Sequence, residues 1–291
     1  MIQTTATQLR NSAIFVFALI VLVASCKKDD ASPDGTAALE ALPKDTGGTH
    51  KANPLGSNAS PYGYYLYTPS GYTNSGPKFP LLVFMHGSGE IGNSSTNSKN
   101  LDKILANGPP KLIKAGKWVP KFPMVVASLQ IHDGWYDLAK VKKFTEFIIA
   151  NYQVDTTRIY LTGLSMGGYG VWDQVMTYGK GSHATAIVPI SGSGILTGDR
   201  TKKAAPIPVW AFHGAEDQTV APAFDKAVHK AINDLNPEVR AKLTIYPATD
   251  HDAWTKTYNS AGMTAAVDPA YDPFSMDIYS WMLQYVKQPK K

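Results

Sequence analysis

Seven short apolar or β-branched runs are spaced along the chain, and turn residues follow most of them. Several runs are apolar at every position, which is typical of parallel strands that are covered on both faces. The first run is followed by Thr-Pro-Ser-Gly and is expected to form an early antiparallel strand. The runs are residues 64–67, 79–85, 124–129, 159–162, 186–190, 209–212 and 243–246.

Segments with helical periodicity lie between these runs. From Leu138 to Tyr152 the apolar residues recur three or four positions apart, and a second helix is expected from Pro222 to Leu235. Strands and helices that alternate in this way predict an α/β fold with a doubly wound, mostly parallel sheet. In such a sheet the functional groups lie at the carboxyl ends of the strands.

The run at residues 159–162 leads directly into a G-x-S-x-G motif centred on Ser165. A strand that turns sharply into a helix holds such a serine in a strained conformation, with its hydroxyl pointing out of the sheet edge. Gly163 and Gly167 supply the clearance for this turn, and Gly168 lets the helix pack closely on the strands. The alternative is a glycine-rich turn that happens to contain a serine. The preceding strand favours Ser165 as a nucleophile.

A serine hydroxyl becomes reactive when an imidazole takes its proton and a carboxylate orients that imidazole. Asp217 and its neighbour Glu216 both follow the strand at 209–212, after a His-Gly turn. His251 lies a few residues beyond the last strand, and Asp250 beside it adds another carboxylate. His229 falls inside the second helix and is expected to be a solvated surface residue. We therefore predict that His251 is the base.

Acyl transfer also needs two fixed N–H donors for the oxyanion. One is expected from Met166, the residue after the nucleophile. The other is expected from Ser88, in the loop after the strand at 79–85. His86 is interpreted as a residue that braces this loop rather than one that contacts the reacting groups.

Several segments together resemble the predicted-peptidase/carboxylesterase branch of the α/β-hydrolase superfamily. This branch is close to dienelactone hydrolases, polyhydroxybutyrate depolymerases and the feruloyl esterases of carbohydrate esterase family 1. The resemblance covers about residues 60–287 and implies an α/β-hydrolase fold. Its H-G-x-x-D-x-x-V pattern favours Asp217 over Glu216. The matching segments are residues 86–90, 107–113, 163–168, 210–217, 251–254 and 279–283.

The connection between residues 190 and 208 is short, so we expect a minimal lid or none. An uncovered site suits a polymeric substrate or a small soluble ester. Trp135, Tyr169 and Trp254 are predicted to wall the acyl pocket, where aromatic rings could stack on a sugar or a cinnamoyl group. Residues 259–275 could fold over the site.

These features predict a serine carboxylesterase that works through an acyl-enzyme on feruloyl, acetyl or other small esters, including esters of polysaccharides. The alternatives are a peptidase of the prolyl-oligopeptidase type, a polyester depolymerase, or a surface-binding lipoprotein without turnover. No zinc-type Cys/His spacing or phosphate loop occurs, so neither a metal nor another cofactor is expected. The net charge of +5 comes from scattered basic residues, which gives no indication of nucleic-acid binding.

The N-terminal segment reads as a targeting signal. Arg10 precedes an apolar run at residues 13–24, which is too short to span a bilayer. The run ends in Leu-Val-Ala-Ser before Cys26, the single cysteine, and resembles the lipobox of bacterial lipoproteins. We expect a signal peptide at 1–25, lipid attachment at Cys26, a flexible tether at 26–60 and a catalytic domain at 61–291.

The residues after Cys26 bear on where the protein is displayed. Lys27-Lys-Asp-Asp30 resembles the charged tag of surface lipoproteins in the Bacteroidetes group. This resemblance implies anchoring in the bacterial outer membrane, with exposure on the cell surface.

Overall fold

The computed structural model describes Met1 and residues 33–197 and 199–287. The chain divides into two units, Met1–Asp30 and Ala31–Lys291. Apart from Met1, the predicted signal peptide and Cys26 lie outside the described residues. Within the described part, no helix has the length and apolar character needed to cross a bilayer.

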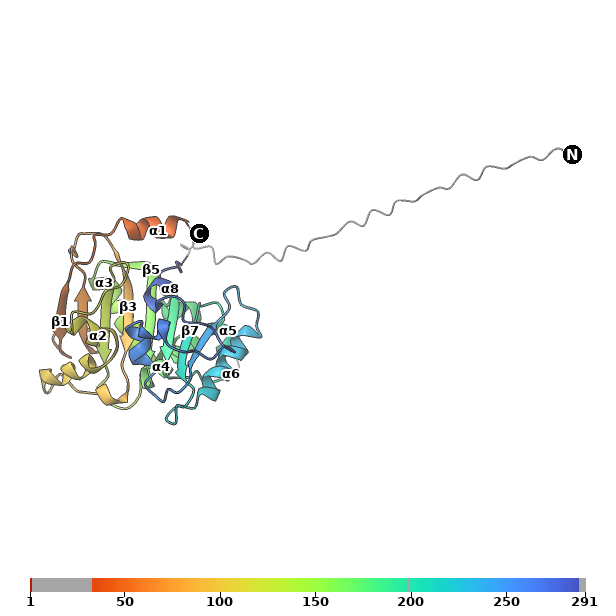
Figure 1. Ribbon diagram of the computed structural model, residues 1–291. Helices are drawn as coiled ribbons and strands as arrows, with labels where there is room; N and C mark the ends of the chain where they lie inside the picture. Colours follow the sequence, from red (N-terminus) through yellow and green to blue (C-terminus); the bar gives the residue numbers. More distant parts are fainter. Residues whose placement is uncertain (2–32, 198, 288–291) are drawn as a thin grey trace. The chain divides into compact units, whose positions relative to one another are not determined.

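One mixed sheet of eight strands organises the second unit (Figure 1). The strand order is β1-β2-β4-β3-β5-β6-β7-β8. β2 pairs antiparallel with both β1 and β4, and all other pairs are parallel. The predicted mostly parallel, doubly wound sheet is therefore confirmed. The strands are β1 (Thr49–Asn53), β2 (Gly63–Thr68), β3 (Phe79–Met85), β4 (Val125–Gln130), β5 (Val154–Leu164), β6 (Ala186–Ile190), β7 (Trp210–Gly214) and β8 (Lys242–Tyr246).

The two helices predicted from periodicity are present as α3 and α6. α3 begins where the Asp137 carboxylate accepts the N–H of Lys140 at 3.0 Å, an N-cap that satisfies a free helix donor. α6 begins with Pro222, whose missing N–H costs nothing in the first turn. The α-helices are α1 (Pro33–Glu40), α2 (Gly108–Lys114), α3 (Leu138–Asn151), α4 (Met166–Tyr178), α5 (Arg200–Ala204), α6 (Pro222–Asn233), α7 (Trp254–Tyr258) and α8 (Ile278–Met282). The 3₁₀ helices are η1 (Ser88–Glu90), η2 (Ser98–Ala106), η3 (Gly179–Ser182) and η4 (Ala261–Thr264).

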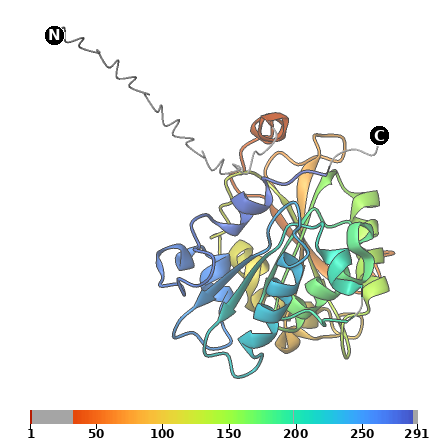
Figure 2. The same ribbon diagram turned by 90° about the vertical axis from the view of Figure 1, so that its right-hand side faces the viewer.

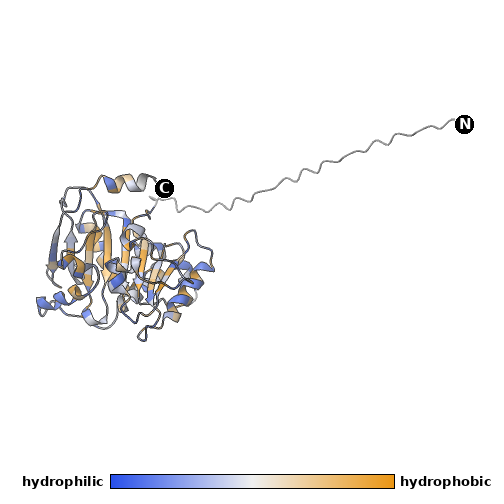
Figure 3. Cartoon of the chain, in the orientation of Figure 1, coloured by the Kyte–Doolittle hydropathy of each residue, from blue (hydrophilic) through white to orange (hydrophobic). Residues whose placement is uncertain are grey.

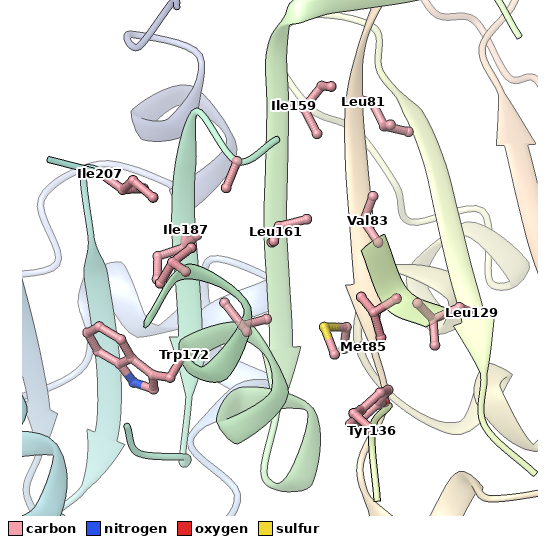
Figure 4. Packing of buried hydrophobic residues seen from close by; sticks show 14 of the residues in the cluster. Leu81, Val83, Met85, Leu129, Tyr136, Ile159, Leu161, Trp172, Ile187 and Ile207 are labelled. Atoms are coloured by element: carbon pink, nitrogen blue, oxygen red, sulfur yellow. The ribbon is translucent and has the colours of Figure 1, made fainter. Parts of the chain in front are cut away.

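Helices cover both faces of the sheet, as Figure 2 shows from the side. Alternate residues of β3 enter two hydrophobic clusters: Val83 and Met85 pack under α3, α4 and α6, whereas Leu82 and Phe84 face α7 and α8. Figure 4 shows part of the first cluster, in which side chains from neighbouring strands gather on one face. The central strands are accordingly the most hydrophobic part of the fold (Figure 3). Covering both faces explains why these strands read as unbroken apolar runs.

The segment expected to be a flexible tether contains structure from residue 33 onward, which corrects the predicted boundary at residue 61. β1 pairs with β2 over its whole length, and Leu39 of α1 is buried in the second cluster. The Tyr67 hydroxyl adds bonds to Asp45 at 2.8 Å and to the N–H of Gly48 at 3.0 Å. β1 was missed because its polar sequence shows no apolar alternation. Its backbone nevertheless satisfies the outer edge of β2, which a domain that begins at the predicted residue 61 would leave unpaired.

The segment at 259–275, which was expected to be able to fold over the site, runs in part along the other edge of the sheet. The N–H of Asp268 bonds to the carbonyl of Ile245, and that of Asp272 bonds to the carbonyl of Leu243, each at 2.8 Å. The Thr244 hydroxyl also donates to the Asp272 carbonyl at 2.8 Å. Residues 268–272 therefore cover the edge of β8, where open backbone groups would invite another strand.

Candidate active site

Ser165 lies in the turn between β5 and α4, at the carboxyl edge of the sheet (Figure 1). Its backbone has φ 53° and ψ −120°, a conformation that non-glycine residues rarely adopt. A Cβ at Gly167 would lie 2.0 Å from the Met85 carbonyl oxygen, and one at Gly163 would lie 2.5 Å from the Gly167 oxygen. Both glycines are therefore required by close backbone contacts, as the motif predicted.

The fold brings Ser165, His251 and Asp217 together from three separate turns. His251 Nε2 lies 2.8 Å from Ser165 Oγ, and His251 Nδ1 lies 2.8 Å from Asp217 Oδ2. The carboxylate side chain is fully buried, while the imidazole remains one-fifth exposed. This geometry allows the imidazole to accept the serine proton while its other nitrogen donates to the carboxylate.

Asp217 is held as an ionised acceptor. Its Oδ1 accepts the N–H groups of Thr219 at 2.9 Å and Val220 at 2.8 Å. Burial alone would raise the pKa of Asp217, but these bonds and the bond from His251 outweigh it and lower the pKa below its ordinary value. Glu216 is exposed, so the structure places Asp217 and not Glu216 against the imidazole.

The His251 loop is anchored by backbone bonds. The Ser191 hydroxyl donates to the His251 carbonyl, and the Asp250 carboxylate accepts the His251 N–H, each at 2.8 Å. Asp250 thus contacts the backbone of His251, and Asp217 contacts its ring. The ring of Trp254 stands perpendicular to the imidazole, with centroids 5.0 Å apart, and its Nε1 donates to Asn107 at 3.3 Å.

The loop after β3 lies beside the start of α4, because the Gly167 Cα approaches the carbonyls of Met85 and His86. His86 is fully buried, and its Nε2 accepts the N–H of Ile131 at 3.0 Å. Its Nδ1 therefore carries the proton and donates to the Gly87 carbonyl at 2.6 Å. Burial lowers the pKa of His86 to about 4, which keeps the ring neutral. His86 braces the loop, as predicted.

Two predicted donors sit at helix starts on this loop and turn. Met166 is the first residue of α4, where N–H groups have no partner within the helix. Ser88 opens η1 and is exposed. The positive end of α4 adds a favourable field for negative charge near Ser165.

A cavity of about 310 Å³ opens one helical turn from Ser165, beside Tyr169. Trp135 is 54% exposed, and its ring lies 5.8 Å from that of Tyr169. Three aromatic residues were predicted to wall the acyl pocket. Tyr169 lines this cavity, Trp135 packs against the ring of Tyr169, and Trp254 contacts His251 instead. The cavity lining is Tyr169, Ser193, Gly194, Ile195, Leu196, Phe224 and Ala227.

The connection from β6 to β7 supplies much of this lining. In the described part of this connection, the longest helix is α5, which has five residues. This agrees with the predicted minimal lid. Ile195, Leu196 and Phe224 are between 42% and 58% exposed. Sequence reasoning missed them, because nothing in the sequence distinguishes an exposed apolar side chain from a buried one.

Two other histidines were not anticipated: His229 differs from its expected exposure, and no role was predicted for His213. His229 is half-buried, and its Nε2 bonds to the Ala241 carbonyl at 3.0 Å, so it is not the solvated residue that was expected. His213, at the end of β7, is fully buried between Asp217 and Asp225. A histidine that ends an apolar run just before the predicted acid was the available signal.

Comparisons with known proteins identify a matching family and a relative with a similar sequence. A model of the phospholipase/carboxylesterase family matches residues 72–262, which is more than half of the chain. A bifunctional acetylxylan esterase/xylanase, XynS20E of Neocallimastix patriciarum, is 25% identical over 161 residues. That alignment covers 54% of this chain and 21% of the relative, so the chain matches about a fifth of the relative's length.

Solved structures share the fold. A thermostable esterase superposes with a TM-score of 0.57 at 22% identity, covering 82% of this chain and 63% of that chain. A feruloyl esterase module from Clostridium thermocellum, solved with sinapinate, gives a TM-score of 0.54 at 15% identity. That match covers 87% of this chain and 92% of the module. These structures confirm the predicted fold.

Proposed function

Because the chain belongs to the phospholipase/carboxylesterase family, we propose that it hydrolyses carboxylic esters through a covalent acyl-enzyme on Ser165. The observation that carries this proposal is the contact of His251 with both Ser165 Oγ and Asp217, each at 2.8 Å. The strained turn presents the hydroxyl at the sheet edge, where a substrate carbonyl can reach it.

In the first step, Ser165 Oγ attacks the ester carbonyl carbon while its proton moves to His251 Nε2. The carbonyl oxygen becomes an oxyanion, for which the N–H groups of Met166 and Ser88 are the proposed donors. The same proton then passes to the alcohol oxygen as the carbon–oxygen bond breaks. Water, deprotonated by His251, attacks the acyl-enzyme and releases the acid. Asp217 stabilises the transient imidazolium in both steps.

The cavity beside Tyr169 favours an aromatic acyl group as the substrate. Its volume of about 310 Å³ exceeds what an acetyl group needs, and its lining is largely apolar. Tyr169 and the exposed rings of Phe224 and Trp135 offer stacking surfaces. The preferred substrates are therefore hydroxycinnamoyl esters carried by polysaccharides. Acetyl esters are the second candidate, favoured by the name of the acetylxylan esterase/xylanase relative.

A substrate panel tests this proposal. Methyl ferulate, p-nitrophenyl acetate and a peptide p-nitroanilide would be compared by kcat/KM, and we expect ferulate to exceed acetate and the peptide to be inert. Phe224→Ala should reduce the preference for ferulate over acetate by about 10-fold, because it removes one face of the cavity. Leu235→Ala is the matched control, since Leu235 is another exposed apolar residue and lies beyond the end of α6, outside the cavity lining. Cleavage of the peptide at rates above the esters would instead support the peptidase alternative.

We propose further that the enzyme is anchored in the bacterial outer membrane through lipid on Cys26, and that it is displayed on the cell surface. The support is the apolar run that ends in the lipobox-like Leu-Val-Ala-Ser-Cys and the charged residues that follow it. Cys26→Ser should move the protein from the membrane fraction to the soluble fraction, with esterase activity retained. The substitution removes the proposed attachment site of the acyl chains, and stable anchoring requires more than one such chain. Fractionation with an activity assay measures this, and a membrane-bound Cys26→Ser protein would contradict the anchor.

A further inference from the structure

A second His–Asp pair lies directly behind the catalytic carboxylate. His213 from β7 and Asp225 from the first turn of α6 are both fully buried, with His213 Nδ1 3.0 Å from Asp225 Oδ2. On its other side, His213 Nε2 lies 2.9 Å from the Val220 carbonyl and 3.2 Å from Asp217 Oδ2. The ester-hydrolysis mechanism above makes no use of this pair.

The partners of His213 define where its protons are. A backbone carbonyl only accepts hydrogen bonds, so Nε2 carries a proton and donates it to the Val220 carbonyl, while Asp217 Oδ2 lies 3.2 Å from the same nitrogen. Nδ1 faces the Asp225 carboxylate, whose Oδ1 accepts the Trp172 indole N–H at 3.2 Å. Burial alone would lower the pKa of His213, but the bond and charge of Asp225 outweigh it and raise this pKa. Burial raises the pKa of Asp225. Because Nε2 carries a proton, the 3.0 Å contact between Nδ1 and Asp225 Oδ2 is a hydrogen bond only if one further proton lies between these two atoms.

We propose that the His213–Asp225 pair positions the catalytic carboxylate, with His213 Nε2–H shared between the Val220 carbonyl and the Asp217 oxygen that receives His251 Nδ1–H. This inference rests on the proposed esterase function of the site. Asp217 then has donors on both oxygens: two backbone N–H groups on Oδ1, and two imidazoles on Oδ2. Such a carboxylate cannot rotate away from His251 without breaking several bonds.

Sharing one oxygen between two imidazoles also has an electrostatic consequence. The donor from His213 withdraws negative charge from Asp217 Oδ2 and so weakens its hold on the proton of the His251 imidazolium. His251 can then return that proton to the leaving alcohol more readily. The titratable groups that face the pair are Asp217 from the loop before α6, His229 from α6, Tyr169 from α4 and, beyond Asp217, His251.

The decisive variant is His213→Gln in the full-length chain. We expect kcat for an ester to fall about 10-fold with KM unchanged, since an uncharged amide replaces the imidazole that Asp225 holds beside Asp217, and the substrate cavity is not altered. We also expect the acidic limb of the kcat–pH profile to move to higher pH, because the weaker donor at residue 213 leaves more negative charge on Asp217 to hold the His251 proton. Loss of folded protein would reduce the amount of active enzyme without moving that limb.

Asp225→Asn separates the positioning of His213 from the negative charge of Asp225. The asparagine amide can donate to a neutral His213 Nδ1, so Nε2–H still reaches Asp217. We expect a smaller loss of kcat than in His213→Gln and a smaller shift of the acidic limb in the same direction. His50→Gln is the matched control, because His50 is a half-buried histidine of β1 whose ring contacts are with Tyr65 and Tyr67. Its pH profile should match that of the wild type.

Histidine ¹⁵N NMR without substrate gives a readout that does not depend on turnover. The pH midpoint of the His251 ring signals should rise in His213→Gln. An unmoved midpoint and an unmoved acidic limb in both variants would overturn the positioning role, as would a wild-type kcat in folded His213→Gln. If the wild type cleaves no ester but the His251 midpoint still moves, the proposed function fails and the positioning role stands.

Discussion

Ser165→Ala is expected to lower kcat for every ester substrate by about 10⁴-fold or more, because it removes the nucleophile of the proposed acyl-enzyme. The residual rate would come from oxyanion donors and substrate binding alone. The domain should remain folded, since the hydroxyl makes a single hydrogen bond, to His251 Nε2. Steady-state kinetics on p-nitrophenyl acetate, together with thermal unfolding, measure both effects.

Ser95→Ala is the matched control, because Ser95 is an exposed loop serine whose hydroxyl bonds only to the nearby Asn93. This variant should keep the wild-type kcat and should still be labelled by a fluorophosphonate probe, whereas Ser165→Ala should not be labelled. Substantial turnover in folded Ser165→Ala would rule out the acyl-enzyme mechanism at this residue.

Asp217→Asn is expected to lower kcat by about 10⁴-fold while leaving the shape of the site intact. The amide would present a donor where His251 Nδ1–H needs an acceptor, which favours the wrong imidazole tautomer. Glu216→Gln and Asp250→Asn are the controls: the first residue is exposed, and the carboxylate of the second accepts only the backbone N–H groups of His251 and Gln218. Both should affect kcat far less than Asp217→Asn, and a larger loss in Glu216→Gln would move the acid by one residue.

Asp217 also gives the fold a pH dependence with a defined sign. Its pKa is lower in the folded state than its ordinary value, so its ionised form stabilises the fold. This contribution is complete above the unfolded pKa of about 4 and is lost as the pH falls through the folded value. Urea unfolding measured between pH 7 and pH 3 should therefore show that the free energy of unfolding falls less with decreasing pH in Asp217→Asn than in the wild type.

The sheet and the nucleophile turn were predictable because their signals are local. Unbroken apolar runs mark strands that helices cover on both sides, and β3 shows how alternate residues enter two different clusters. The requirement for Gly163 and Gly167 is likewise local, since the turn itself creates the close backbone contacts. Ser165, Asp217 and His251 meet because each follows a strand end at one edge of a parallel sheet.

Other features depend on contacts between distant segments, and no local pattern reports them. β1 is polar along most of its length and is recognisable only by its pairing with β2. The cavity beside Tyr169 arises where the connection after β6 meets α6. His213 and Asp225 are twelve residues apart and become a pair only when α6 packs on β7. Burial of a histidine between two carboxylates is a property of the assembled layers.

The positive φ of Ser165 lowers the stability of the fold, whereas the proposed catalysis requires a serine at this position. A non-glycine residue in so sparsely populated a region costs about 1–3 kcal/mol. Glycine would relieve that strain and lose only about 0.5–1 kcal/mol through its greater freedom in the unfolded chain. A lineage that no longer needed turnover would therefore gain robustness by replacing this serine with glycine. Retaining serine here requires continuing purifying selection for hydrolysis, and a drift to glycine would mark descendants that kept the fold and abandoned the chemistry.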